Sequence, residues 1–318
     1  GMAAIDVDTG TVLDSAFPSL EYTGSIVSMS ASDGRVYLSG WCKMTTGGPD
    51  QSLCGFNRDG TPLAGWAAPS GLEGTNGIVI ATEGRLYIGS TAFSGDAPGV
   101  RIRGFSPLTG QRDGWRTRAF AGAQNVRAMA LSGGRLFVSL PSIGALSGMP
   151  QLLAFDAATG SDVEWNAQVG GPVGALAVAG DRVAITGGFT SAGGARRLGL
   201  AAIDLRSGRL ADVQPPALPS GVETLATQGD LAVAGGPGGL TAFSIASGRI
   251  YGQVSVDGAV LSLAFNDATL FVGGNFRRIN GIARRHLAAV DLRTGVVTPW
   301  DPEPDNSVTR LIAANGAL

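Results

Sequence analysis

LFVGGNFRRINGIARRHLAAVDLRTGVVTPWDP, residues 270–302, sets out a pattern that the rest of the chain repeats. A β-rich run ends in Gly-Gly and is followed by a longer loop. A second run ends in Val-Asp-x-x-Thr-Gly, and the chain then extends to Trp-Asp-Pro. Residues 183–216, VAITGGFTSAGGARRLGLAAIDLRSGRLADVQPP, follow the same order. Repetition at a fixed period indicates a repeat architecture, so this stretch decides the fold.

The period can be measured at the glycine that ends the turn after the second run. Successive copies of this glycine lie 40 to 50 residues apart, and the start of the run before the loop keeps the same step. Agreement between two independent markers makes chance a poor explanation. The turn glycines are Gly10, Gly60, Gly110, Gly160, Gly208, Gly248 and Gly295.

Each repeat contains four short runs of apolar and β-branched residues bounded by Gly, Asp and Asn, which is the signal for β-strands. The Thr-Gly turn suits a tight hairpin whose glycine has positive φ. No window keeps a helical period, and 50 glycines disfavour helices. Four antiparallel strands per repeat predict an all-β fold, a β-propeller with seven blade positions, formed by residues 1–318 as one domain. An open solenoid would need polar capping repeats, and neither end has that composition.

The two ends of the chain complement each other. Residues 2–6 (MAAID) match the third strand at residues 200–204 (LAAID), and residues 307–318 match a first strand and its turn. We expect residues 1–20 and 305–318 to share one closing blade. The residues that would correspond to 271–286 are missing between these two matches. We therefore expect that this sequence is a segment of a longer chain. Otherwise a neighbouring copy's strand, a ligand peptide or solvent should fill the gap in the closing blade. Direct pairing of residues 2–6 with 308–313 would contradict this.

The composition disfavours several classes of function. Charged residues make up 15% of the chain and the net charge is −2, which gives no general attraction to nucleic acid or anionic membranes. No apolar run reaches the roughly 20 residues of a membrane span. A single histidine, His286, makes a histidine-based metal site or triad hard to build. We therefore predict no catalytic residues, no metal site and no cofactor.

The two cysteines predict a disulfide. Cys42 follows a second strand, Cys54 lies in the third, and their midpoint falls in the expected hairpin tip. They should face each other across the ladder, where the Cβ spacing accepts a disulfide. The alternative is two buried thiols. A disulfide would imply an oxidising compartment.

Other repeated polar residues favour structural roles. The arginines after the first turn share one position in the repeat, and the acids at the turn starts should accept backbone N–H bonds. The repeated tryptophans should be packing anchors at blade edges. These residues are Arg35, Arg85, Arg135 and Arg182, then Asp156, Asp204 and Asp291, then Trp66, Trp115, Trp165 and Trp300.

Two groups of residues are candidates for binding. The loops between second and third strands are rich in arginine, and they predict either a solvated rim or a site for carboxylate, sulfate or sugar acid. The second residues of the first strands (27, 78, 127, 174, 223, 261 and 309) form a ring at the channel mouth, where the only charges, Arg127 and Glu223, either bind a ligand or lie there by chance. The loop residues are Arg196, Arg197, Arg277, Arg278, Arg284, Arg285 and His286.

The Gly-Gly-x-Phe, Arg-x-x-Leu-Ala-Ala-x-Asp and Thr-Gly-x-x-x-x-Trp pattern of residues 270–302 resembles bacterial extracellular propeller repeats of the delta-60 type. The resemblance is strong at 183–216 and 270–302 and weaker elsewhere. It implies a protein that is extracellular or at the cell surface, with the periplasm as an alternative, and it carries no established catalytic residues. The turn is also similar to the tryptophan-docking repeat of pyrroloquinoline quinone dehydrogenases. Here, however, the glycine and tryptophan are five apart instead of four, and no adjacent cysteine pair is present.

These observations favour a binding or scaffolding module over an enzyme. Its partner would be a carbohydrate, a small anion or another surface protein. One alternative is a carbohydrate-active lyase or hydrolase at the channel mouth, which needs two converging acids, or an acid with Tyr or His. The other is a quinone-dependent oxidoreductase.

Overall fold

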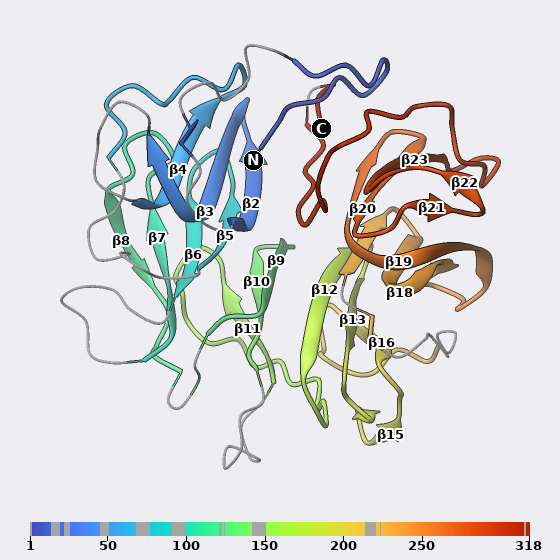
Figure 1. The fold of residues 1–318 in the computed structure, drawn as a ribbon. Coiled ribbons are helices and arrows are strands. Elements are labelled where there is room, and N and C mark those ends of the chain that lie inside the picture. Colours follow the sequence, from blue (N-terminus) through green and yellow to red (C-terminus); the bar gives the residue numbers. More distant parts are fainter. Residues whose placement is uncertain are drawn as a thin grey trace.

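The chain folds as an all-β propeller. The computed structural model describes residues 2–13, 20–21, 26–44, 51–67, 77–90, 99–120, 123, 125–141, 151–213, 221–222, 224–314 and 316–318. Within these residues there are strands and turns and no helix. The strands follow one another in sequence order around a central space, and the two ends of the chain meet (Figure 1).

The described strands form six successive units in which the first strand pairs with the second and the second with the third, always antiparallel. We number them units 1 to 6, over residues 26–63, 78–120, 126–169, 173–213, 222–256 and 259–301. Unit 1 contains β2 (Ile26–Ser32), β3 (Arg35–Met44) and β4 (Gln51–Asn57), with β1 (Leu20–Glu21) paired to the end of β3; unit 2 contains β5 (Ile78–Ala81), β6 (Leu86–Ser90), β7 (Arg101–Phe105) and β8 (Arg112–Arg116). Unit 3 contains β9 (Ala128–Ser132), β10 (Arg135–Ser139) and β11 (Leu152–Asp156); unit 4 contains β12 (Val173–Ala179), β13 (Arg182–Gly187), β14 (Ser191–Ala192), β15 (Ala195–Arg196) and β16 (Leu200–Asp204).

Units 5 and 6 belong to one continuous sheet. β18 (Leu231–Ser244) includes both middle strands of unit 5, because the loop between them is reduced to Gly-Pro-Gly-Gly. β19 (Ile250–Asn266) is the fourth strand of unit 5 and then the first strand of unit 6. The remaining strands are β17 (Thr224–Gln228), β20 (Thr269–Gly274), β21 (Arg278–Ile279), β22 (Ile282–Ala283) and β23 (Leu287–Asp291).

The turn after each third strand has the structure that its sequence predicted. In unit 3 the Asp156 carboxylate accepts hydrogen bonds from the backbone N–H groups of Ala158 and Thr159 and from the Thr159 hydroxyl. Gly160 then adopts a φ of 77°. These bonds to the charged form lower the pKa of Asp156, with the Thr159 backbone bond as the largest cause. The same bonds recur at Asp6, Asp204 and Asp291, which confirms a structural role for these acids.

Several of the turn glycines also pack on a tryptophan of the preceding unit. A Cβ atom at Gly160 would lie 3.3 Å from the Trp115 ring, and one at Gly208 would lie 3.2 Å from Trp165. Trp115 and Trp165 are in turn 4.9 Å from the ring of Tyr87 and 5.0 Å from that of Phe137. Gly160 and Gly208 are therefore needed both for their φ and for space. The tryptophans are packing anchors between blades, as predicted.

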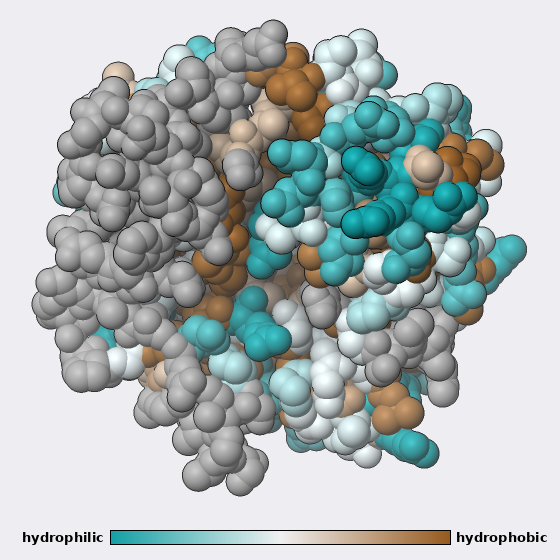
Figure 2. Space-filling view, viewed as in Figure 1, coloured by the Kyte–Doolittle hydropathy of each residue, from teal (hydrophilic) through white to brown (hydrophobic). Residues whose placement is uncertain are grey.

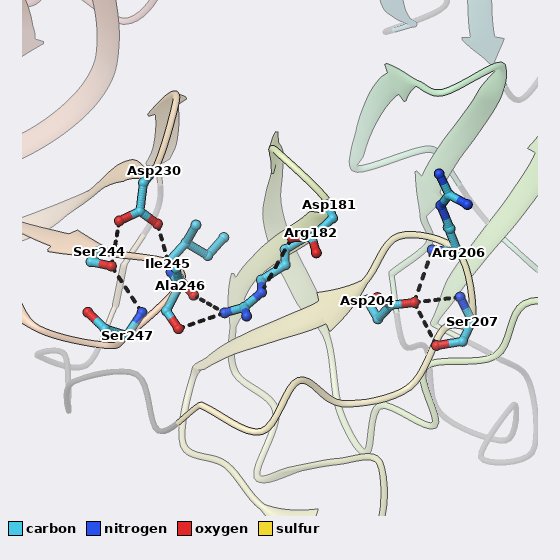
Figure 3. A network of polar contacts seen from close by, with 10 residues as sticks. All are labelled: Asp181, Arg182, Asp204, Arg206, Ser207, Asp230, Ser244, Ile245, Ala246 and Ser247. Atoms are coloured by element: carbon cyan, nitrogen blue, oxygen red, sulfur yellow. Dashed lines mark hydrogen bonds and ion pairs between the residues drawn. The ribbon is translucent and has the colours of Figure 1, made fainter.

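The arginines after the first turns connect neighbouring units. Arg182 of unit 4 donates to the carbonyl oxygens of Ile245 and Ala246, which lie in the turn of unit 5 (Figure 3). Asp230 holds that turn through the Ala246 N–H and the Ser244 hydroxyl. Arg85 and Arg135 reach the next unit in the same way. These bonds satisfy carbonyl groups across the interfaces between units 2 and 3, 3 and 4, and 4 and 5, and they confirm the structural role of these three arginines.

The two ends of the chain meet beside unit 6. Ile5 and Leu318 exchange two backbone hydrogen bonds, in the register that joins Val290 to Leu270 in unit 6. Residues 308–313 pack instead on unit 6, where Val308 contacts Gly273. A complete seventh blade formed by both ends stays a prediction, as does a longer parent chain.

Two details differ from the predicted blades. Within the described residues, units 2 and 5 have a regular fourth strand, whereas the fourth run of the other units makes a single bridge, such as Phe155 to Asp162.

The predicted cysteine register is also wrong. A bulge after Ser39 places Cys42 opposite Gln51, and Cys54 opposite Leu38. Cys54 is buried, but the Cys42 side chain lies outside the described residues, so the disulfide between Cys42 and Cys54 stays a prediction.

Candidate functional site

The loops between second and third strands in units 4 and 6 fold into hairpins with one shared backbone frame. β14 pairs with β15 and β21 with β22 through equivalent residues. The Arg197 N–H donates to the Thr190 carbonyl in unit 4, and the Arg284 N–H donates to the Arg277 carbonyl in unit 6, both at 3.0 Å. Because antiparallel strands alternate in direction, both hairpins emerge on the same face of the propeller, opposite the turns that contain the glycines.

The same two kinds of side chain anchor both hairpins. Phe189 and Phe276 are fully buried beneath them. The Arg284 guanidinium donates to the Thr298 carbonyl at 2.8 Å and lies 3.3 Å from the Asp301 carboxylate, with 13% of its side chain exposed. Arg197 donates to a carbonyl of the same segment in unit 4, that of Val213, at 3.5 Å. These contacts tether both arginines to the body of the propeller, and their part in a binding surface stays a prediction.

The other four loop arginines are exposed on the hairpins. These are Arg196 in unit 4 and Arg277, Arg278 and Arg285 in unit 6. In unit 6 the Asp257 carboxylate accepts the backbone N–H groups of Arg277 and Arg278 at 2.7 and 2.9 Å. These bonds lower the pKa of Asp257, the Arg277 N–H being the largest cause. The carboxylate thus fixes the backbone of the loop and leaves both side chains in solvent.

His286 occupies an unusual backbone position. Its φ is 64°, a conformation that glycine adopts easily, and the equivalent residue of unit 4 is Gly199, with a φ of 71°. The His286 Nδ1 atom is buried and has no hydrogen-bond partner among the described residues. Comparison of Arg-Arg-His-Leu with Arg-Leu-Gly-Leu could have identified this position from the sequence.

A second candidate lies at the centre of the ring. A cavity of about 1470 Å³ opens there, and it is lined by every described member of the predicted ring; Glu223 lies outside the described residues. Figure 2 shows the hollow, with apolar surface on its inner wall. Arg127 lines it with an exposed side chain.

Arg310 also lines this cavity, and sequence reasoning missed it. Its Nε donates to the Val27 carbonyl at 2.8 Å, which joins the C-terminal end of the chain to unit 1. Neighbouring protein atoms cover part of the exposed Arg310 side chain, and this partial removal from bulk water lowers the pKa of its guanidinium. No sequence signal marked it, because residues 27 and 310 come together only when the ring closes.

In the part of the chain that the structure describes, no group of three or more His, Cys, Asp or Glu side chains could hold a metal ion. Nor do these residues include a helix long and apolar enough to cross a bilayer.

Comparisons with known proteins agree with the fold. The family model described as outer membrane protein assembly factor BamB matches residues 2–209 and 98–318. No curated protein matches the chain significantly. The computationally designed Ika8 protein is similar, with a TM-score of 0.58 at 16% identity over 93% of each chain. KlHsv2 with loop 6CD replaced by a Gly-Ser linker gives a TM-score of 0.55 at 12% identity, over 85% of this chain and 78% of that one. The Neurospora crassa Pan2 WD40 domain gives 0.50 at 14% identity, over 72% and 65%.

Proposed function

Because the chain belongs to the family described as outer membrane protein assembly factor BamB, we propose that it is a cell-envelope propeller that binds and scaffolds other proteins. It acts in the periplasm or at the cell surface, and its repeats are of the delta-60 type. Its partner docks on the face that carries the hairpins of units 4 and 6. We call this surface, formed by Arg196, Arg277, Arg278 and Arg285, the arginine face.

The proposal rests on one observation: the backbone of the two hairpins is fixed, whereas their arginine side chains are exposed. The backbone of both hairpins is held by hydrogen bonds and by buried Phe189 and Phe276. A partner therefore meets guanidinium groups on a preorganised frame, which reduces the entropy lost on binding. Arginine forms bidentate bonds with carboxylates, and complementary charge selects partners and speeds association. The partner surface is consequently acidic.

The central cavity gives little support to the alternative that the chain is an enzyme. A glycosidase-type reaction needs two carboxyl groups on either side of the scissile bond. Asp305 is the single acid among the described residues that line the cavity. A binding role requires no such pair.

The experiment is charge reversal on the arginine face. A variant with R196E, R277E, R278E and R285E is titrated with a fluorescein-labelled polyglutamate peptide, and anisotropy is measured at low and moderate salt. The matched control is R206E, R209E, R249E and R293E, which changes the same charge on exposed arginines of the opposite face. We expect affinity to fall by about tenfold or more in the first variant and by much less in the control.

Equal losses in both variants would mean that net charge alone attracts the peptide, and the arginine face would be abandoned. Far-ultraviolet circular dichroism establishes that both variants fold. If sulfate competes with the peptide as strongly as free glutamate peptide does, the face binds small anions instead of an acidic protein surface.

A further inference from the structure

The central cavity is lined by two arginines, Arg127 and Arg310, that have no ion-pair partner among the described residues. The turn and rim arginines of the structure commonly face a carboxylate, as Arg118 does with Asp162 and Arg284 with Asp301. Among the described residues no carboxylate lies within ion-pair distance of Arg127 or Arg310. The described part of the wall carries these two arginines and a single acid, Asp305, which gives this part an excess of positive charge.

Arg310 is held in a defined position. Its Nε donates to the Val27 carbonyl at 2.8 Å and one terminal nitrogen donates to the Thr309 carbonyl at 2.7 Å. The second terminal nitrogen has no partner among the described residues, and the exposed side chain borders the cavity. Two carbonyl contacts thus orient the guanidinium and leave N–H groups for an anion, at little further loss of side-chain entropy.

A little over half of the cavity wall is apolar. Ile26, Met29, Ile78 and Leu261 line it, and the hollow in Figure 2 shows apolar surface inside. Ligand sites in proteins combine such surface with a few placed polar groups, and usually occupy about 300 to 1,000 Å³. A cavity of about 1470 Å³ accommodates an apolar body of that size.

We propose that this cavity binds a small amphipathic monoanion, a molecule with one carboxylate or sulfonate headgroup and an apolar body. Arg310 fixes the headgroup, with Arg127 as a second cation on the wall. The apolar body lies against the first strands of the ring. This site is separate from the arginine face, so either can fail without the other.

A matched pair of probes tests the proposal. 8-Anilinonaphthalene-1-sulfonate carries the anionic headgroup, and N-phenyl-1-naphthylamine is the same fluorophore without it. Each is titrated by fluorescence into the wild-type chain and into Arg310→Gln, Arg127→Gln, Arg310→Lys and the control Arg206→Gln. We expect Arg310→Gln to weaken sulfonate binding about tenfold and Arg127→Gln about threefold. Arg310→Lys should retain most of the affinity, and Arg206→Gln all of it.

The neutral probe should bind all variants alike, and dodecanoate should displace the sulfonate probe better than dodecanol does. Unchanged sulfonate affinity in both glutamine variants would overturn the proposal, as would an equal loss for the neutral probe. Arg310→Gln also removes the bond to unit 1 and could unfold the ring. In that case the Arg127→Gln variant decides between the outcomes, because the Arg127 side chain makes no hydrogen bond or ion pair with the described residues.

Discussion

The hairpins of units 4 and 6 share a backbone and differ in their exposed side chains. Equivalent hydrogen bonds, buried phenylalanines and one tethered arginine recur in both. Unit 4, however, presents Thr190, Ser191 and Leu198 where unit 6 presents Arg277, Arg278 and Arg285. What the two loops share is explained by folding. What only one of them has is not required by the fold, and it is therefore the better candidate for binding.

The largest expected effect concerns the shared phenylalanines. Phe189→Ala and Phe276→Ala should each lower the free energy of unfolding by about 3–5 kcal/mol, because each leaves a cavity beneath its hairpin. Denaturant unfolding at equilibrium measures both. Two similar losses support one common frame. A loss near zero at Phe189 alongside a full loss at Phe276 would show that the loop of unit 4 does not depend on its anchor.

The tethered arginines should differ in a predictable way. Arg284→Ala removes a partly buried ion pair with Asp301 and a bond to the Thr298 carbonyl, and should cost about 2 kcal/mol of stability. Arg197→Ala removes a long carbonyl contact without an ion pair, and should cost about 1 kcal/mol. A double-mutant cycle with Asp301→Asn isolates the pair. No coupling between positions 284 and 301 would contradict the assignment of Arg284 as an anchor.

Features that recur in the repeat could be predicted from sequence, and features that depend on ring closure or local register could not. The turn glycines, the tryptophans and the arginines after the first turns were interpretable because each appears several times in the same position. By contrast, adjacent Arg284 and Arg285 look alike in sequence, yet only Arg284 lies on the side of the hairpin that meets Asp301. The register of Cys42 depended on one extra residue in a bulge. The role of Arg310 depended on a partner 283 residues away.

His286 tests whether the difference between the loops reflects function. A non-glycine residue in the left-handed region carries a backbone cost of about 1–2 kcal/mol, and glycine avoids it at some loss of chain entropy. His286→Gly should therefore leave stability unchanged or raise it by up to about 1 kcal/mol. The reciprocal change, Gly199→Ala, should lower stability by about 1 kcal/mol, since its Cβ would also lie 3.0 Å from the Gly187 carbonyl oxygen.

Thermal unfolding and polyglutamate binding are measured on the same samples. Higher stability together with weaker binding would indicate that histidine is present for its side chain. A clear loss of stability in His286→Gly would show instead that the imidazole packs into the fold, and the position would lose its functional interest.

The smallest expected effect is an acid sensitivity that only the hairpin of unit 6 has. The N–H of Arg277 is accepted by the Asp257 carboxylate, whereas the equivalent N–H of Thr190 is accepted by the Gly170 carbonyl, which does not titrate. The pKa of Asp257 is lowered in the folded chain, first by the Arg277 N–H and then by the Arg278 N–H. A group with a lowered folded pKa contributes stability that is present above its ordinary value of 3.8 and is lost as pH falls through the folded value.

Lowering the pH below about 4 should therefore loosen the backbone at residues 277 and 278 while residue 190 keeps its protection. Hydrogen exchange of these amides, followed by mass spectrometry on matched peptides, measures the difference after correction for intrinsic rates. Asp257→Asn should reproduce at neutral pH part of the loosening that acid causes in the wild-type chain, because a neutral amide accepts the two N–H groups less strongly. Equal changes in both hairpins on acidification would mean that the whole ring opens, and Asp257 would then have no separate role in holding the arginine face.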